Sequence, residues 1–189
     1  MDVAGFRKLF PPLNEEKPPI YLDNACMTLR PTSVIQAIQE YYSRNPSCAG
    51  RSVHRWGMSI SQTVTRTRRK LANHIGAENS REVIFTPNAT HSINQVAAGL
   101  DWKPGDVVIT SDREHNSNLV PWLQQSANGV KLQTVESHPD NEFDLEAFET
   151  ACAEAGNSLR VVSLVHVGNL DGVEIPVAEA AKIAHDYDA

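Results

Sequence analysis

Hydrophobic residues recur in two different patterns along this chain. From residue 83 onward, short apolar runs alternate with longer segments in which apolar residues return every three or four positions. Apolar runs of about four to eight residues are typical of buried strands, whereas a spacing near 3.6 residues is typical of amphipathic helices. The pattern therefore predicts that strand and helix alternate through this part of the chain.

The alternation predicts a specific order of elements. The predicted strands are Val83–Phe85, Val107–Thr110, Val130–Val135 and Leu159–Val167. The predicted helices are Ile93–Leu100, Leu119–Ala127, Leu145–Ala155 and Val177–Tyr187. Strands separated by helices of about ten residues form βαβ units, in which the strands are parallel and helices cover the sheet. We therefore predict an α/β fold with three α/β/α layers around a mostly parallel sheet.

The first part of the chain follows a different pattern. Residues 1–19 are rich in proline and are expected to form an arm with one short helix around Val3–Leu9. A short strand is predicted at Ile20–Asp23. A first helix should then start at Pro31 or Thr32. A second helix should span Ser59–Ile75 and end at Gly76. We expect each helix to bury one apolar face: Val34, Ile35, Ile38 and Tyr41 or Tyr42 in the first, and Ile60, Val64, Leu71 and Ile75 in the second.

The last predicted helix is followed by no further strand. A crossover helix in a βαβ unit leads to the next parallel strand, yet Asp188 and Ala189 end the sequence directly after this helix. We therefore expect a truncated chain, either a fragment or a split gene product.

Composition and charge narrow the class of protein. The chain has 189 residues, of which 41% are hydrophobic and 21% charged, as in ordinary globular proteins. Its formal net charge of −6 argues against a nucleic-acid or anionic membrane partner. No apolar run approaches the ~20 residues of a membrane span, and the N-terminus has no secretion-signal pattern, so we expect a cytoplasmic protein. Cys26, Cys48 and Cys152 are too widely spaced to indicate a disulfide framework or a metal site.

The segment Asn88-Ala89-Thr90 lies where a predicted strand turns into a predicted helix. The first amide groups of a helix have no partners, and the positive end of the helix dipole lies there. With the Thr90 hydroxyl as a further donor, this turn can hold a phosphate group. Asn88 or Thr90 can equally be a simple N-cap, so the local sequence leaves both interpretations open.

His115 lies in the segment Thr110–Asn118, TSDREHNSN, which leaves the end of a predicted strand. Open α/β sheets bind their ligands at such loops. An imidazole in this place can be a general base, a metal ligand, a ring that stacks on a ligand, or only a surface group. Asp112 and Glu114 are too close in sequence to converge on one metal ion with His115, which argues against a metal site.

Asn169 belongs to a third loop, within Val165–Gly172. Gly168 and Gly172 permit a tight turn after a buried strand. Asn169 can simply shape that turn, or it can project from the carboxyl edge of the sheet. Because loops that follow parallel strands share one edge, we expect Asn169 at the same rim as Thr90 and His115, and their joint occurrence favours a ligand pocket.

These segments occur in an order that resembles the cysteine desulfurase branch of the class V aminotransferases, which are pyridoxal-phosphate (PLP) enzymes of fold type I. The matching segments are YLDNA at Tyr21–Ala25, RSVH at Arg51–His54, VIFTPNATHSIN at Val83–Asn94, REHNSNLVPW at Arg113–Trp122 and HVGNLDG within Val165–Gly172. The resemblance covers nearly everything from about residue 20 onward. It implies that residues 20–189 are the N-terminal part of the large domain of such an enzyme, preceded by the arm at residues 1–19.

The resemblance implies a role for each matching residue at the rim. Ala89 and Thr90 match the residues that hold the cofactor phosphate. His115 matches the histidine that stacks on the PLP ring and helps to move protons, so it is the implied catalytic residue. Asn169 matches the asparagine beside the ring oxygen of the cofactor and the substrate. The chemistry is consistent, since PLP needs an anion site, a flat partner and polar ring contacts.

The resemblance also implies a substrate and partners. Ala25 and His54 match positions on the substrate side of the pocket. The implied reaction cleaves the C–S bond of cysteine, an amino-acid substrate, to give alanine and transferable sulfur. Relatives of this type form homodimers with active sites near the subunit interface, and a sulfur-acceptor protein is an implied partner.

Several positions depart from the family pattern. Ala89 stands where many relatives have threonine, and Gly168 stands where serine is common. The residues Leu170-Asp171-Gly172 differ from the usual run of small apolar side chains. These departures bear on the choice of cysteine as substrate more than on PLP as cofactor.

Four functional residues of the family are expected beyond Ala189. They are the aspartate that pairs with the pyridinium nitrogen, the Schiff-base lysine, the persulfide cysteine and the arginine that binds the substrate carboxylate. The lysines present do not match the family's strand-end loop: Lys8, Lys17, Lys70, Lys103, Lys131 and Lys182. We therefore expect the chain to be inactive alone, because the covalent chemistry needs that lysine.

Other interpretations remain. One is a different class V enzyme, such as an aminotransferase, a selenocysteine lyase or an epimerase. Another is a truncated chain that serves as a non-catalytic binding or dimerising partner. A third is the product of a decayed gene. An open reading frame that continues beyond codon 189 would favour an enzyme over the product of a decayed gene. A size measurement would test whether the chain associates with a partner.

Overall fold

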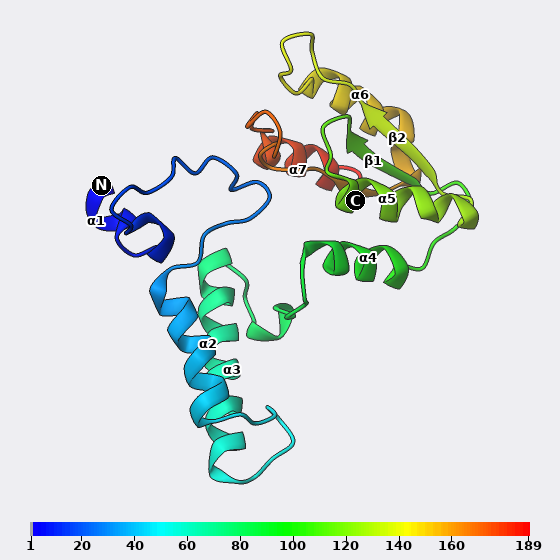
Figure 1. Ribbon diagram of the computed structural model, residues 1–189. Coiled ribbons are helices and arrows are strands. Elements are labelled where there is room, and N and C mark those ends of the chain that lie inside the picture. Colours follow the sequence, from blue (N-terminus) through cyan, green and yellow to red (C-terminus); the bar gives the residue numbers. More distant parts are fainter. Residues whose placement is uncertain (1) are drawn as a thin grey trace. The chain divides into compact units, whose positions relative to one another are not determined.

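The computed structural model describes residues 2–189, which fold as two compact units (Figure 1). The first, here called the N-terminal unit, ends at Phe85, and the second, the C-terminal unit, is Thr86–Ala189. Among the described residues, none of the helices combines the length and the apolar character needed to cross a bilayer.

The C-terminal unit is built on a three-stranded sheet. Its strands are β1 (Val107–Ser111), β2 (Lys131–Val135) and β3 (Leu159–Ser163), in the order β2-β1-β3. Both pairs are parallel, which confirms the predicted topology. All five residues of β1 are buried because this strand lies in the middle of the sheet and is covered on both faces.

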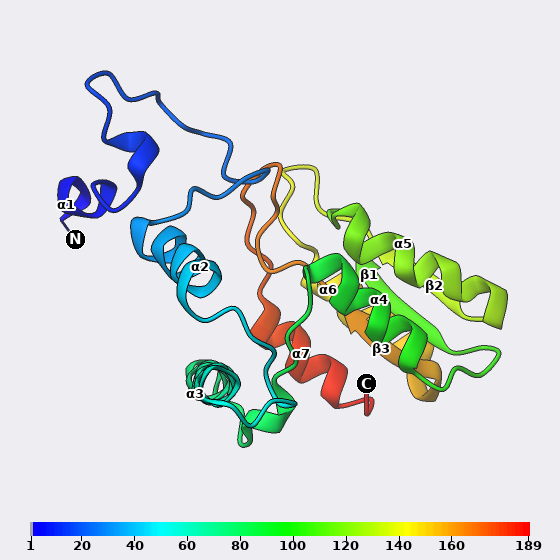
Figure 2. The same cartoon turned by 60° about the horizontal axis from the view of Figure 1, so that its bottom comes forward.

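Helices cover both faces of this sheet and complete the predicted three layers (Figure 2). They are α4 (Ala89–Gly99), α5 (Asn116–Gln124), α6 (Leu145–Ala155) and α7 (Val177–His185), with short 3-10 turns at Gln125–Asn128 and Gly156–Ser158. The face that carries Val108 packs against Ala97 of α4 and Trp122 of α5. The face that carries Ile109 packs against α6 and α7.

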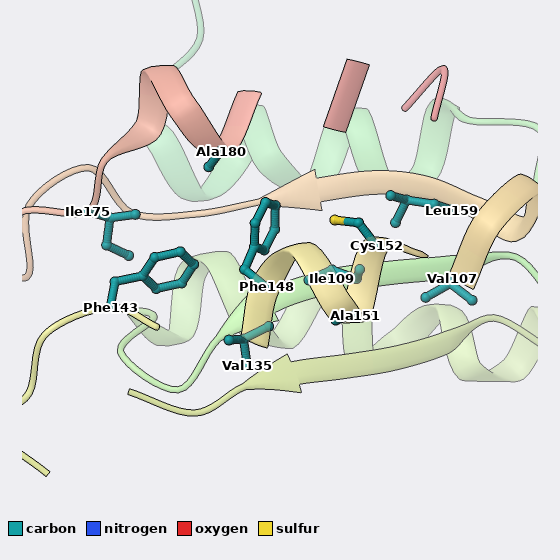
Figure 3. Close-up of a cluster of buried hydrophobic side chains, with 10 residues drawn as sticks. All are labelled: Val107, Ile109, Val135, Phe143, Phe148, Ala151, Cys152, Leu159, Ile175 and Ala180. Carbon is teal, nitrogen blue, oxygen red and sulfur yellow. The ribbon is translucent and has the colours of Figure 1, made fainter. Parts of the chain in front are cut away.

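The larger of the two buried clusters lies between the sheet and α6. Figure 3 shows Phe148 and Cys152 of α6 directed toward Ile109 and Leu159 of the strands. Phe148, Cys152 and Ile109 are each 0% exposed. A fully buried phenylalanine side chain stabilises the fold by roughly 1.5–3 kcal/mol relative to an exposed one. The C-terminal unit therefore has a real core of its own.

The turns at the amino edge of the sheet show in which direction the helices run. The amide of Gly105, just before β1, donates to the carbonyl of Gly129, just before β2, at 2.9 Å. The amino ends of the two strands thus lie together, where α4 and α5 end. Both helices must therefore begin near the carboxyl edge of the sheet, the edge at which parallel folds bind ligands.

The N-terminal unit is helical in the part that the structure describes. It contains α1 (Val3–Arg7), α2 (Thr32–Arg44), α3 (Arg55–Ile75) and 3-10 turns at Pro11–Leu13 and Ser80–Glu82. The arm is attached to the start of α2, because the amide and hydroxyl of Thr32 both donate to the carbonyl of Leu9 at 2.8 and 3.1 Å. Gly76 ends α3 in the left-handed conformation, with φ of 72°, as predicted.

Two of the predicted strands are wrong. Ile20–Asp23 and Val83–Phe85 are irregular, and Ile20, Leu22 and Ile84 are 88%, 87% and 75% exposed. A strand is stable only when its amide and carbonyl groups pair with a neighbour. Within residues 2–189 neither segment has a strand partner, and a short apolar run cannot reveal whether one exists.

Several predicted boundaries also needed correction. The strand predicted at Leu159–Val167 ends at Ser163, after which the chain turns away from the sheet. Three helices begin before their first predicted residue, at Arg55, Ala89 and Asn116. In each case a polar side chain caps the helix, and the cap rather than the first apolar residue sets its start: His54, Asn88 and His115.

The predicted burial of α2 and α3 is largely wrong. No residue of α2 is buried, and Ile38 is 55% exposed. In α3, Leu71 and Ile75 are exposed at 39% and 68%, whereas Ile60 and Val64 are half-buried. Periodicity identifies the face that could be buried, but burial itself requires a second surface.

Candidate functional site

The candidate site lies at the carboxyl edge of the sheet in the C-terminal unit. Three loops leave the strands there: Asp112–His115 after β1, Glu136–Asp144 after β2 and Leu164–Pro176 after β3. The start of α4 lies at the same edge. The structure thus places Thr90, His115 and Asn169 on one rim of one unit.

The start of α4 has a rigid frame and free donors. The Asn88 side chain accepts the amide of His91 at 2.8 Å, so Asn88 is the N-cap. The Thr86 hydroxyl bonds the Ser92 hydroxyl at 2.6 Å and donates to the carbonyl of Asn88 at 3.2 Å. This cap holds the first turn while leaving Ala89 and Thr90 exposed. The capping role of Asn88 and an anion site at the next two residues are therefore compatible.

His115 is exposed and caps α5. Its Nδ1 accepts the amide of Ser117 at 3.1 Å and lies 2.8 Å from the Ser117 hydroxyl. The ring is therefore held from one side by the helix start, and the remainder of its surface is open to a ligand.

Asn169 lies at the tip of a short hairpin. Val167 pairs with Glu174 in an antiparallel bridge, and the Gly168 amide donates to the Val173 carbonyl at 2.8 Å. Gly172, with φ of 75°, completes the turn in a conformation that favours glycine. Asn169 is exposed at this tip, which projects from the carboxyl edge beside β3.

The carboxylate of Glu114 holds the loops together. Oε1 of Glu114 accepts the Ser111 hydroxyl at 2.8 Å and the Val165 amide at 2.7 Å. Its Oε2 accepts the side-chain amide of Asn118 at 2.7 Å. Glu114 thereby fixes the loop that carries His115 to the segment that leads to Asn169.

Asn118 extends this network into the sheet. Its Oδ1 accepts the Ser163 hydroxyl at 2.6 Å and the Trp122 indole N–H at 3.4 Å. The Thr110 hydroxyl donates to the Ser163 carbonyl at 3.0 Å. The spacing of Glu114 and Asn118, four positions apart across a helix start, is the signal that could have revealed this network from the sequence.

Ala25 and His54 belong to the N-terminal unit. Ala25 is exposed in a turn at Asn24–Cys26, and the Tyr21 hydroxyl donates to the Asp23 carbonyl at 3.2 Å and to the Met27 carbonyl. His54 caps α3, where its Nδ1 accepts the Gly57 amide at 3.4 Å. The structure gives both residues ordered local settings within their own unit.

The rim lies at the edge where parallel folds bind ligands. The model of the family described as aminotransferase class-V matches residues 20–189. The chain belongs to this family. The matched range includes Ala89, His115 and Asn169.

Several relatives of this chain are named as cysteine desulfurases. A probable cysteine desulfurase of Synechocystis sp. is 36% identical over 195 residues, which cover 98% of this chain and 45% of the relative. The apo cysteine desulfurase of Thermococcus onnurineus has a TM-score of 0.89 and 34% identity, over 99% of this chain and 46% of that structure. The cysteine desulfurase CsdA of Escherichia coli has a TM-score of 0.80 and 28% identity, over 98% and 46%. The chain thus spans less than half the length of these relatives.

Three of the six lysines belong to the C-terminal unit, and these lie away from the candidate rim. Lys103 precedes β1 and Lys131 begins β2, both at the amino edge of the sheet. Lys182 lies in the second half of α7. The remaining lysines, Lys8, Lys17 and Lys70, belong to the N-terminal unit.

Proposed function

We propose that this class V chain is the N-terminal part of a PLP-dependent cysteine desulfurase. The proposal rests on one observation above all: a helix start, an exposed imidazole and an asparagine occupy one rim in a chain whose family match spans residues 20–189. That span also supports a division into an arm, residues 1–19, and the N-terminal part of the large domain, residues 20–189.

The start of α4 would hold the cofactor phosphate. The exposed Ala89 and Thr90 offer main-chain donors at the positive end of an 11-residue helix, and Thr90 adds its hydroxyl. Ala89 has no hydroxyl, so at that position the main chain alone would bind. The Asn88 cap leaves these donors free because it takes the amide of His91 instead.

His115 and Asn169 would flank the cofactor ring. The imidazole of His115 supplies a flat partner whose position is set by its bond to Ser117. Asn169 supplies an amide donor or acceptor at the tip of its hairpin. We propose that Ala25 and His54 of the N-terminal unit serve the substrate, as the matching residues of the family do.

The proposed reaction is cleavage of the C–S bond of cysteine to alanine, with transfer of the sulfur. When bound, PLP supplies an electron sink that stabilises the negative charge developing on the substrate carbon. The protein's part is to bind the phosphate, to orient the ring against His115 and to move a proton there. The names of the relatives support cysteine as the substrate.

We propose that none of the six lysines serves as the family's cofactor-bearing lysine. The three in the C-terminal unit lie away from the rim, which supports this view. The isolated chain is then expected to release neither alanine nor sulfide from cysteine in the presence of PLP. Detection of both products from the purified chain would overturn this part of the proposal.

The remaining proposals concern the setting of the protein. We propose a homodimeric parent enzyme that passes sulfur to an acceptor protein in the cytoplasm. Cys26 and Cys48 are exposed free thiols, and exposed thiols persist best in a reducing compartment. Size-exclusion chromatography with light scattering would test association of the chain.

The decisive experiment measures PLP binding by the purified chain. Titration followed by the absorbance and fluorescence of PLP should give a saturable signal. Thr90→Ala should weaken binding roughly tenfold, because a donor to a charged phosphate is lost. Thr150→Ala is the matched control, since Thr150 is exposed in the middle of α6, away from the rim. Failure of the unaltered chain to bind PLP, or equal effects of both changes, would contradict the proposal.

The role of His115 needs a substitution that keeps the helix cap. Asparagine is a good N-cap, so His115→Asn removes the ring while retaining a capping oxygen. We expect weaker PLP binding and an altered absorbance maximum, with an unchanged unfolding transition. His185→Asn, at the exposed end of α7, is the control.

A further inference from the structure

Arg113 connects all three loops at the carboxyl edge of the sheet. From the loop after β1, its guanidinium contacts two residues of the loop after β2: Nε lies 3.4 Å from the Ser137 hydroxyl, and Nη2 donates to the Asn141 side chain. Nη1 lies 3.6 Å from Oδ2 of Asp171, in the hairpin after β3. A planar group with five donors can make such divergent contacts, which a lysine cannot.

The far end of this connection is shaped by Gly168 and Asp171. Oδ1 of Asp171 accepts the Val173 amide at 3.1 Å, so the carboxylate lies folded into its own hairpin. A Cβ atom on Gly168 would lie 2.3 Å from the same oxygen, which is too close to be tolerated without movement. Gly168 is buried and has no positive φ, so the close approach of Asp171 is the constraint at this position.

We infer that Arg113 is a positioning residue that sets where the Asn169 hairpin lies. Through Asp171, it fixes the hairpin that bears Asn169 to the same loop that carries His115. The part of this inference that concerns cofactor contacts rests on the proposed PLP function. The contacts of Arg113 with Ser137, Asn141 and Asp171, here called the clamp, do not rest on that function, because they lie within the chain.

Gly168 and Asp171, two departures from the family pattern, have one structural cause. Gly168 and Asp171 are a matched pair, since the carboxylate occupies the space that a side chain at position 168 would need. The other oxygen of Asp171 faces Arg113, whose guanidinium supplies a cation. We expect a serine at position 168 to displace the Asp171 carboxylate and to weaken its contact with Arg113.

Hydrogen exchange of the hairpin amides tests the clamp directly. The Gly168, Gly172 and Ile175 amides donate within this hairpin at 2.8, 2.9 and 2.9 Å. Arg113→Met should speed their exchange about tenfold, as expected when a local opening becomes easier while the core remains folded. Arg160→Met, on the exposed face of β3, is the control. Unchanged hairpin exchange in Arg113→Met would overturn the inference.

A pair of substitutions at the other end keeps the test valid if Arg113→Met folds poorly. Gly168→Ala should speed exchange of the Gly172 amide in the otherwise unaltered chain, because it displaces Asp171. In an Asp171→Ala background, which already lacks the clamp, Gly168→Ala should add no further increase. Equal effects of Gly168→Ala in both backgrounds would overturn the matched-pair argument.

PLP titration of the same variants separates the clamp from the proposed function. If the chain binds PLP, Arg113→Met should weaken binding and shift the PLP absorbance maximum, and Arg113→Lys should restore part of both. Faster hairpin exchange with unaltered PLP binding would overturn the positioning role for Asn169. If the unaltered chain does not bind PLP, the proposed function fails, while the exchange data still decide whether Arg113 holds the hairpin.

Discussion

The two units differ sharply in how much of their helical surface is buried. In the 21 residues of α3 only Gly57 and Ala72 are buried, and α2 buries none. By contrast, the 11-residue α6 buries Phe148, Ala151 and Cys152 against the sheet. Helices form in both units because capping and periodic apolar residues are local properties. Burial follows only where a second surface, here the sheet, lies against the helix.

The largest test of this comparison truncates one apolar helix side chain in each unit. Phe148→Ala should destabilise the C-terminal unit by about 3–5 kcal/mol, because it leaves a cavity at a fully buried site. Ile38→Ala, at a 55% exposed site in α2, should cost less than about 1 kcal/mol. Urea unfolding followed by tryptophan fluorescence and circular dichroism measures both. Similar costs would mean that the two units are equally well packed.

Thiol labelling sharpens the comparison without changing the sequence. Cys26 and Cys48 of the N-terminal unit are exposed, whereas Cys152 is 0% exposed. At pH 8, Cys152 should react roughly 100-fold or more slowly with an alkylating reagent, as read by peptide mass spectrometry. Rapid labelling of Cys152 would show that α6 separates easily from the sheet.

The same thiol predicts the direction of a pH effect. Burial, and secondly the charge of Glu149, raises the pKa of the Cys152 thiol from 9.0 to about 11. Between these values the unfolded chain loses the thiol proton while the folded chain keeps it. The contribution of this group to stability is therefore present below pH 9 and is lost as the pH rises toward 11. In a Cys152→Ala variant, the fall in stability over this range should be smaller.

The polar network at the rim should have a moderate effect. Glu114→Gln replaces one carboxylate oxygen by an amide that faces hydrogen-bond donors, so we expect a loss of about 1–3 kcal/mol in the C-terminal unit. Glu154→Gln, on the exposed side of α6, is the control and should change the stability little. Equal unfolding midpoints for the two variants would argue that the network contributes no stability.

Helix caps provide the smallest contrast between the units. Oδ1 of Asp144 accepts the Ala147 amide at 2.8 Å, so Asp144→Ala should cost about 1 kcal/mol. The cap of α3 is longer, 3.4 Å from Nδ1 of His54 to the Gly57 amide, and His54→Ala should cost less, about 0.5 kcal/mol. Chemical unfolding monitored by circular dichroism can compare the two, and a reversed order would contradict this ranking.

Much of the C-terminal unit could be predicted from the sequence. The strand Val107–Thr110 and the helix Leu145–Ala155 were predicted almost to the residue, because each has a clear period and lies between turn-forming residues. The parallel topology followed from their alternation. The failed strands, Ile20–Asp23 and Val83–Phe85, depend on pairing with a neighbour, which no local pattern encodes.

The candidate site was predictable only in part. The shared rim of Thr90, His115 and Asn169 follows from parallel strands, and the structure places all three at that edge. Their roles toward PLP stay predictions. The network of Glu114 and the contacts of Arg113 depend on loops that are distant in sequence. Glu114 contacts Val165, 51 positions away, and Arg113 contacts Asp171, 58 positions away. The spacing of residues along the chain does not reveal such contacts.

The bond that caps α5 has a consequence for the tautomer of His115. Because Nδ1 accepts the Ser117 amide, a neutral ring must carry its proton on Nε2. Nε2 is therefore the atom left to exchange a proton with a bound molecule. A ring flip would put a carbon, Cδ2, in the place of Nδ1 and give up the cap, so the helix start selects both the plane of the imidazole and its protonated edge before any ligand arrives.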